Sequence, residues 1–363
     1  MINKMLNQAQ YELLHYPYYS IGDHLSRPFR ALFSKNYKPH DRFGFANGLL
    51  AKALMDYYKK HVNTEEGGEA LDVVKRYYNR WISRGCKIRS ISDVYSGMAL
   101  IDLHQLTGQD KYKKGLDKIM KYLFSIETDD FGSVITYPER KDKMIYADSL
   151  GMICPFLAKY GERYNDMNST NLAVVMIQNY MNYGMEEKLL LPYQCYDPES
   201  KMKYGIIGWG MSVGRLLMGM SETLYYMEPE RQSYEQIKQY YRRIVDKVET
   251  YQSEGGLYHW QLSAKEGPAD TGATSMILYS IAQSLEDKIL IGIHKSRMMR
   301  GIEALKVCIQ DDGTLPGASK DTDKFNEYPI DFGSYPWALG PALSLFLIME
   351  DEIKVNTNEN IIL

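Results

Sequence analysis

The amino-acid sequence predicts an all-α fold, on two observations. Twelve segments carry apolar residues at helical spacing, whereas strand-like alternation is scarce. These segments alternate between stretches rich in Gly, Ala, Ser and Met and stretches with more charge, such as 110–119 and 232–243. A helix that is apolar on most faces is buried, and a half-polar helix lies outside. Six inner and six outer helices predict an (α/α)6 toroid, formed as a single domain over residues 1–363.

Taken in order, residues 2–15 form the first predicted helix. An irregular N-terminal arm at about 16–42 follows, because Pro17, Pro28 and Pro39 interrupt it. The remaining predicted helices cover 43–61, 68–83, 93–107, 110–125, 146–163, 167–182, 209–227, 231–253, 270–286, 290–309 and 335–351. Small hairpins at loop positions are expected in the short runs 131–137, 191–196 and 256–262.

Composition narrows the class of protein. A net charge of −3 does not favour nucleic acid as a partner. The four cysteines are far apart and lack the Cys/His spacing of a zinc site, so neither metal nor other cofactor is predicted. The N-terminus has no apolar signal core, and no apolar run approaches the roughly 18 residues of a membrane span. We therefore expect a cytoplasmic monomer or homodimer with no membrane contact, and the 31 tyrosines suit contact with sugars.

The starts of the predicted inner helices share a composition. Nearly all of them combine an aromatic residue or an acid with glycine. In a toroid the inner helices run parallel, so these starts gather at one end and line a funnel. The acids and aromatics concerned include Asp93, Tyr146, Asp148, Trp209, Asp270 and Trp337. An alternative for each acid is that it caps its own helix, and an alternative for each tryptophan is a place in the core.

Motifs around these starts resemble a known family. They are Asp93-Val-Tyr-Ser-Gly97 with the later Leu-Thr-Gly108, Asp148-Ser-Leu-Gly-Met-Ile-Cys-Pro-Phe-Leu-Ala158, Asp270-Thr-Gly-Ala-Thr-Ser-Met276 and Trp337-Ala-Leu-Gly340. Over about 43–350 the chain is similar to the unsaturated glucuronyl and rhamnogalacturonyl hydrolases of glycoside hydrolase families 88 and 105. The resemblance implies an (α/α)6 toroid that hydrates the vinyl ether of a 4,5-unsaturated uronic acid without a metal. It also implies that Asp148 is the general acid and base and that Asp93 is its partner.

One wall of the funnel departs from the family pattern. In Trp209-Gly-Met-Ser-Val-Gly-Arg215, Met211 stands where the family has arginine, and Arg215 stands where it has a second tryptophan. Gln194 stands where the family tends to have histidine. The departures indicate an altered substrate, and Arg215 is a candidate replacement for the missing arginine.

Further candidates for substrate binding are His259 and Trp260, which precede the fifth inner helix, and His40 beside Asp41 and Arg42. A lone loop histidine is also often structural or solvated, and a charge cluster usually faces solvent. Together with Tyr146, Trp209, Arg215, Asp270 and Trp337 they complete the predicted binding set.

Three functions are compatible with the sequence. The first is a hydrolase of unsaturated uronyl oligosaccharides or related acidic glycan fragments. The second is a non-catalytic or altered-specificity glycan-binding protein of polysaccharide assembly or degradation, which the broken sugar-binding set favours. A sugar epimerase or another toroid hydrolase is a weaker third, because such enzymes use His pairs or Glu acids and only His259 lies at an inner helix start.

Overall fold

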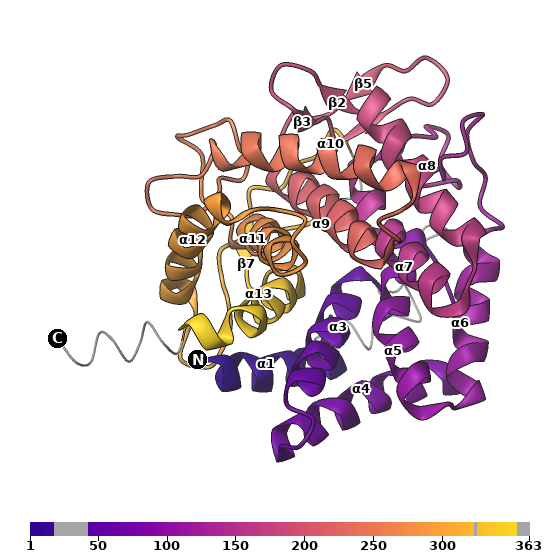
Figure 1. Cartoon of the computed structure of the whole chain (residues 1–363), viewed down its shortest axis with the longest axis vertical. Helices are drawn as coiled ribbons and strands as arrows, with labels where there is room; N and C mark the ends of the chain where they lie inside the picture. The colour runs from indigo at the N-terminus through magenta and orange to yellow at the C-terminus, as the bar shows by residue number, and fades with distance from the viewer. Residues whose placement is uncertain (18–42, 323–324, 354–363) are drawn as a thin grey trace, which may run out of the picture.

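A computed structural model describes residues 1–17, 43–322 and 325–353. Its helices form two concentric rings (Figure 1). The inner ring consists of α3 (Phe45–Lys60), α5 (Gly97–Thr107), α7 (Ala147–Tyr164), α9 (Gly210–Tyr226), α11 (Thr271–Glu286) and α13 (Pro336–Ile348). The outer helices are α4 (Glu65–Ser83), α6 (Asp110–Leu123), α8 (Met167–Tyr183), α10 (Gln232–Glu249), α12 (Lys295–Cys308) and α1 (Ile2–His15).

Contacts between helices close the inner ring. Each inner helix packs against the next one along the chain, and α13 packs against α3. Each also packs against the outer helix paired with it, with α1 serving α13. The predicted all-α toroid is therefore confirmed. None of the described helices is long and apolar enough to cross a bilayer. The single domain and the oligomeric state remain predictions, and most of the predicted arm at 16–42 lies outside the described residues.

Burial follows the predicted division into inner and outer helices. All residues from the start of α9 to Leu224 are buried, as are those from the start of α13 to Leu347. The outer helix α10 buries a single stripe formed by Ile237, Tyr241, Ile244, Val245, Val248 and Glu249. An all-round apolar helix has to be surrounded by protein, whereas a one-sided helix can face water.

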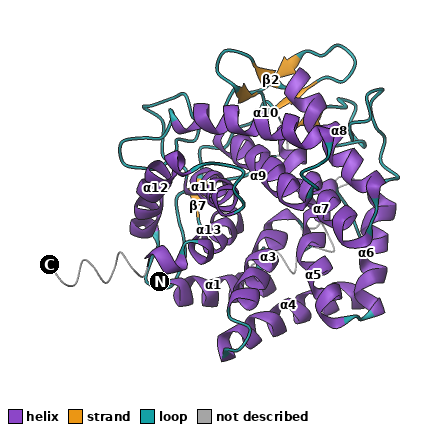
Figure 2. Ribbon diagram, viewed as in Figure 1, coloured by secondary structure: helices purple, strands orange, loops and turns teal. Residues whose placement is uncertain are grey.

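Strands are short; in Figure 2 the one labelled β2 lies beyond α10 at the top of the view, and β7 is seen beside α11 and α13. One sheet joins β1 (Ile145–Tyr146), β4 (Cys195–Tyr196) and β5 (Lys203–Tyr204). Two further pairs are β2 (Met185–Glu186) with β3 (Leu191–Pro192), and β6 (Ala318–Ser319) with β7 (Phe332–Gly333).

The predicted hairpins need correction. The run 191–196 holds both β3 and β4, but each strand pairs with a different segment. The runs 131–137 and 256–262 contribute single bridges, between Thr128 and Val134, Trp209 and Gln261, and His259 and Ala269. Alternation over six or seven residues signals an extended chain but does not identify its partner.

Helices α7 and α9 approach each other closely because glycines stand at their crossing. A Cβ atom on Gly151 would lie 2.5 Å from the carbonyl oxygen of Arg215, and one on Gly219 would lie 2.8 Å from that of Leu150. A methyl group at either place would force the helices apart. The close approach brings the Arg215 side chain on α9 to the amino end of α7.

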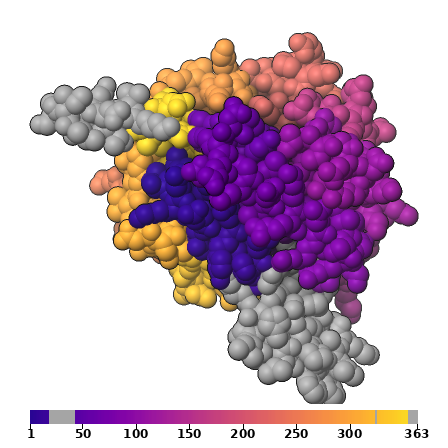
Figure 3. Space-filling view, turned by 90° about the horizontal axis from the view of Figure 1, so that it is seen from below, coloured from indigo at the N-terminus to yellow at the C-terminus, as the bar shows by residue number. Residues whose placement is uncertain are grey.

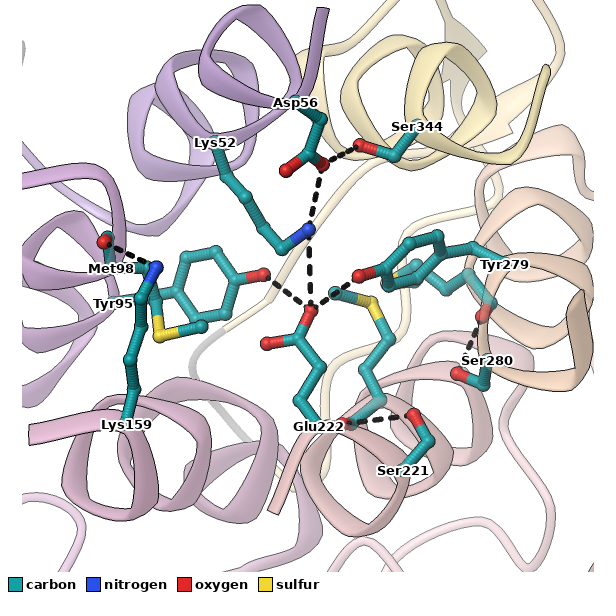
Figure 4. Close-up of polar contacts among 12 residues, drawn as sticks. Lys52, Asp56, Tyr95, Met98, Lys159, Ser221, Glu222, Tyr279, Ser280 and Ser344 are labelled. Carbon is teal, nitrogen blue, oxygen red and sulfur yellow. Dashed lines mark hydrogen bonds and ion pairs between the residues drawn. The ribbon is translucent and has the colours of Figure 1, made fainter. Parts of the chain in front are cut away.

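A group of buried polar side chains, here called the axial cluster, lies between the inner helices (Figure 4). Glu222 Oε1 on α9 accepts hydrogen bonds from Tyr279 Oη at 2.9 Å and Tyr95 Oη at 3.2 Å. Lys52 Nζ on α3 lies 3.9 Å from the same oxygen and 2.8 Å from Asp56 Oδ2. Ser344 on α13 donates to Asp56 Oδ2 at 2.8 Å. The cluster therefore links opposite sides of the ring.

A second buried ion pair lies beside the axial cluster. Lys159 Nζ on α7 is 2.7 Å from Asp102 Oδ2 on α5 and donates to the carbonyl oxygen of Met98 at 3.0 Å. Burial lowers the pKa of Lys159 to about 8, and it does so against the opposing attraction of Asp102. Charges on inner helices are thus matched across the ring, because a lone buried charge is costly.

A buried carboxyl on α1 makes stability depend on pH. Glu12 is 3% exposed, and burial, partly offset by a 2.9 Å hydrogen bond from Gln8, raises its pKa from 4.5 to about 7. Between these two pH values the folded chain holds a proton that the unfolded chain has lost, so stability falls as pH rises. Above pH 7 the folded protein bears the full free-energy cost of the buried Glu12 carboxylate. We expect Glu12→Gln to stabilise the protein by about 2–3 kcal/mol at pH 8 and by little at pH 4.5.

Denaturant unfolding at the two pH values measures this effect. Glu230→Gln, at an exposed position, is the control and should change neither curve. An equal stabilisation by Glu12→Gln at both pH values would show that the Glu12 charge is not the cause.

Candidate active site at the amino ends of the inner helices

Asp148 does not cap its own helix. It is the second residue of α7, whose N-cap residue is Tyr146, and the cap makes no side-chain hydrogen bond. The Asp148 carboxylate instead faces α9, where Oδ1 accepts a hydrogen bond from Arg215 Nη1 at 3.0 Å. Ser212 Oγ lies 3.3 Å from Oδ1 and 3.4 Å from Oδ2. Ser212 and Arg215 are three residues apart and share a face of α9. The alternative of a simple helix cap is therefore wrong for this residue.

Arg215 holds two carboxylates at once. Besides Asp148, its Nη1 lies 3.1 Å from Asp321 Oδ1 and its Nη2 lies 2.7 Å from Asp321 Oδ2. The guanidinium carbon lies over the Phe45 ring, 5.0 Å from the centroid. Arg215 is 1% exposed. Its pKa stays above the usual range, because the two carboxylates outweigh the cost of burial.

The environment of Asp148 favours a retained proton. Burial raises the pKa of this carboxyl, Arg215 lowers it, and the nearby Asp321 raises it again, with a net upward shift. Burial is the largest cause, and Arg215 offsets it only in part because its guanidinium is shared with Asp321. A carboxyl whose pKa is raised is better suited to donate a proton, and to take it back, in general acid–base catalysis.

Asp93 lies on the 3-10 helix η1 (Ile91–Ser96), which packs against α7. It is 4% exposed, and its Oδ2 accepts a hydrogen bond from the backbone N–H of Arg89 at 2.7 Å. Its Oδ1 faces Gly44, where a Cβ atom would lie 3.5 Å away. Both predicted acids are thus at the amino ends of neighbouring inner helices, and the role of Asp93 as partner of Asp148 stays a prediction.

Asp270 is a helix cap. Its Oδ1 accepts from the backbone N–H groups of Gly272 at 2.8 Å and Ala273 at 3.1 Å, and its Oδ2 accepts from Ser319 Oγ at 2.5 Å. It is fully buried. These bonds fix the start of α11 against β6, so any contact of Asp270 with substrate would have to replace one of them.

The two central tryptophans lie side by side under a tyrosine. The ring of Tyr328 meets Trp209 edge-on at 5.6 Å and Trp260 edge-on at 6.1 Å. Its hydroxyl donates to Gln194 Oε1 at 2.5 Å and accepts from the N–H of Ile206 at 2.8 Å. Trp209 has no exposed surface, so it offers no face to a sugar in this structure.

The other predicted residues occupy structural positions around this centre. Tyr146 is buried and packs edge-on against Tyr137 at 5.1 Å. His259 Nδ1 lies 2.7 Å from the carbonyl oxygen of Gly267. Trp337 stacks on Tyr335 at 4.4 Å, and its Nε1 donates to the carbonyl oxygen of Ser319 at 3.0 Å. His40 lies outside the described residues.

Sequence reasoning missed Asp321, Tyr328 and Ser212. Asp321 and Tyr328 belong to the connection between β6 and β7, which has no helical periodicity and reads as an ordinary polar loop. Ser212 lies inside the motif at 209–215, and its spacing from Arg215 was the available signal. Among the described residues, no group of three or more His, Cys, Asp or Glu side chains could hold a metal ion. That no metal or cofactor takes part stays a prediction.

Solved structures of known proteins share this fold. A possible member of glycoside hydrolase family 105 from Salmonella enterica matches with a TM-score of 0.83 and 13% identity, over 97% of this chain and 94% of that chain. An unsaturated glucuronyl hydrolase from Bacillus sp. GL1, described as responsible for the degradation of glycosaminoglycan, matches with a TM-score of 0.69 and 13% identity over 97% of each chain. The fold is thus one found among glycoside hydrolases.

Sequence comparison then gives the family. Glycosyl Hydrolase Family 88 matches residues 28–350, and the chain belongs to this family. The unsaturated rhamnogalacturonyl hydrolase YesR of Bacillus subtilis is 20% identical over 267 residues, which are 71% of this chain and 74% of that protein. The predicted resemblance and the prediction of a glycoside hydrolase are confirmed. Membership of the family implies an oligosaccharide substrate, as predicted. The particular sugar and the roles of individual residues stay predictions.

Proposed function

We propose that the chain hydrolyses oligosaccharides that end in a 4,5-unsaturated uronic acid, with Asp148 as general acid and base. The observation that carries this proposal is the position of Asp148. It is a buried carboxyl at the amino end of an inner helix, it does not cap that helix, and its pKa is raised. The activities of the relatives, an unsaturated rhamnogalacturonyl hydrolase and an unsaturated glucuronyl hydrolase, support this substrate class.

The proposed chemistry is hydration of a vinyl ether. Protonated Asp148 gives its proton to C4 of the unsaturated ring, and positive charge develops at C5 and the ring oxygen. The carboxylate left on Asp148 then accepts a proton from the water that attacks C5. The hemiketal so formed opens and releases the next sugar, and Asp148 is returned to its protonated state. Ser212, within 3.4 Å of both Asp148 oxygens, orients the carboxyl during the exchange.

Arg215 is proposed to bind the carboxylate of the uronic acid. It is the cation nearest Asp148, and a guanidinium binds a carboxylate through two parallel hydrogen bonds. This would supply the anion-binding role that Met211, in the usual arginine position, cannot. Asp93 is proposed as the partner of Asp148. Tyr146, Trp209, Trp260, Trp337, His259 and Asp270 are proposed to surround the sugar.

A second candidate function is glycan binding without turnover, or with an altered specificity. The observation that favours it is the closed state of the site, in which Asp321 occupies Arg215 and Tyr328 covers Trp209. Gln194, at a position where the family tends to have histidine, also favours this second candidate. A protein of this kind would bind an acidic glycan and release no product.

The test is a panel of unsaturated disaccharides made by lyase digestion of rhamnogalacturonan and of glycosaminoglycans. Turnover removes the conjugated double bond, so ultraviolet absorbance falls with time, and the freed sugar is measured separately. The saturated disaccharides are the control and should not change. We expect a decay on at least one substrate. Absence of decay over the whole panel, together with binding of the intact glycan, would replace the first candidate by the second.

A further inference from the structure

We propose that Asp321 is an internal competitor for the carboxylate-binding site at Arg215, which a uronate substrate has to displace. The inference rests on the proposed function, because it takes a uronic acid as the ligand. It goes beyond that function in assigning a regulatory role to a residue outside the helices. Its basis is the arrangement of Arg215, Asp148, Asp321 and Tyr328.

The contact between Asp321 and Arg215 has the geometry of a bound carboxylate ligand. Both Asp321 oxygens meet the guanidinium, at 3.1 and 2.7 Å, in a two-pronged arrangement. The Arg215 side chain is 1% exposed, whereas the Asp321 side chain is 33% exposed. The receptor is therefore built into the ring, and the carboxylate reaches it from the solvent side, as a ligand would.

Arg215 has contacts besides those with Asp321. Its Nη1 lies 3.0 Å from Asp148 Oδ1, and its guanidinium lies over the Phe45 ring. Asp321 is thus a second acid on a single cation. With Asp148 in the protonated form that the proposed function requires, Asp321 is the carboxylate that balances the guanidinium, and a uronate carboxylate could take its place without leaving Arg215 unpaired.

Exchange of one carboxylate for another conserves this charge. A uronate in place of Asp321 would again give Arg215 one carboxylate beside the Asp148 carboxyl. The proton on Asp148 would therefore experience the same charge balance in the complex as in the free protein. A neutral sugar offers no such exchange, so the competition selects for acidic ligands.

A second side chain from the same connection points to the same conclusion. Tyr328 follows Asp321 in the link between β6 and β7, and its ring meets both Trp209 and Trp260 edge-on. Residues of one segment thus contact Arg215 and the two indoles. A sugar acid that binds to the cation and stacks on the indoles would replace both contacts.

Asp321→Asn tests the proposal in the full-length chain. The probes are D-glucuronate and its neutral counterpart D-glucuronamide, neither of which has the double bond that is hydrolysed. Affinities are measured by titration calorimetry. An asparagine keeps the size of Asp321 but binds a guanidinium more weakly, so we expect glucuronate to bind about 10-fold more tightly than to the wild type. Glucuronamide binding should not change. Asp331→Asn, an exposed acid on the same connection, is the matched control and should behave as wild type.

A measurement on the wild-type chain guards against a folding defect in the variant. Glucuronate should accelerate backbone hydrogen exchange in the peptide that carries Thr322, whose N–H donates to Asp321 Oδ1 at 2.9 Å. Glucuronamide should leave that exchange unchanged. Unaltered or slower exchange with glucuronate, or a glucuronate affinity that Asp321→Asn does not raise, would overturn the proposal.

The outcomes separate this proposal from the proposed function. Turnover on the disaccharide panel with no effect of Asp321→Asn on glucuronate binding would refute the competition and leave the activity. Tighter glucuronate binding by the variant with no turnover anywhere on the panel would refute the activity and leave the competition.

Discussion

Asp148→Asn is expected to lose turnover by 10²-fold or more (on the order of 10²–10⁴) while the protein stays folded. Asparagine keeps the size of the side chain, and its amide oxygen can still accept the hydrogen bond that Arg215 Nη1 now makes at 3.0 Å. What it cannot do is donate a proton to carbon and recover one from water. The measurement is the rate of absorbance loss on whichever unsaturated disaccharide the wild type consumes, with thermal unfolding as the check on folding.

The pH dependence separates proton transfer from simple loss of a charge. The proposed acid works in its protonated form, so wild-type kcat should fall as pH rises through the raised pKa of Asp148. Arg215 is the main influence that lowers this pKa. Arg215→Gln should therefore move the alkaline decline of kcat to higher pH, even where substrate binding is weakened. An Asp148→Asn variant with near wild-type kcat would assign the chemistry to another residue.

Lys52→Met is expected to destabilise the protein by about 3–5 kcal/mol at pH 8. Lys52 lies 3.9 Å from Glu222 in the axial cluster, and Glu222 has no exposed surface (Figure 4). Burial raises the pKa of Glu222, and Lys52 is the main influence that opposes this shift. Removal of Lys52 leaves a buried carboxylate without its nearest cation. Denaturant unfolding gives the free energy.

Two comparisons make the Lys52 result specific. Because burial raises the pKa of Glu222, more of this carboxyl is protonated at pH 5 than at pH 8, so the loss caused by Lys52→Met should be smaller at pH 5. Adding Glu222→Gln to Lys52→Met should recover part of the lost stability, because the fully buried charge is then gone and only Asp56, whose side chain is 27% exposed, is left without Lys52. Lys75→Met, which removes an exposed ion pair with Asp72, is the control and should cost less than about 1 kcal/mol. A loss of that small size for Lys52→Met would show that the axial cluster does not depend on its charges.

The sequence predicted the toroid and the place of Asp148 because both depend on local patterns. Helical periodicity and the contrast between apolar and half-polar segments identify inner and outer helices without knowledge of their neighbours. The acid of the most specific motif, Asp148, lies where parallel inner helices begin. The cap alternatives had opposite outcomes, since Asp270 caps its helix and Asp148 does not. Whether an acid caps its own helix or turns to another partner depends on the groups that the neighbouring helix places beside it.

Contacts between segments far apart in the chain could not be predicted from the sequence. Lys52 and Glu222 sit singly on separate inner helices, and nothing local pairs them. Asp321 and Tyr328 lie in a polar connection, where acids are usually solvated. Trp209 was expected to line a pocket, but it is completely buried, and one of its ring contacts comes from a tyrosine more than a hundred residues later in the chain. Periodicity reveals which face of an element is buried but not what covers it.

The closure of the ring has a consequence for how the molecule can fold. The segment of α3 meets α13 only through contacts of very long sequence separation, such as Lys60 Nζ with the carbonyl oxygen of Leu347 at 2.6 Å and His61 with Glu350 at 3.1 Å. The indigo helix α1 likewise lies against the yellow and orange C-terminal segments (Figure 3). During synthesis the apolar flank of α3 therefore stays unpaired until α13, almost 300 residues later in the chain, has been made. Such high contact order favours slow closure of the helix ring. Until the ring closes, the nascent chain exposes an apolar surface to which a chaperone could bind.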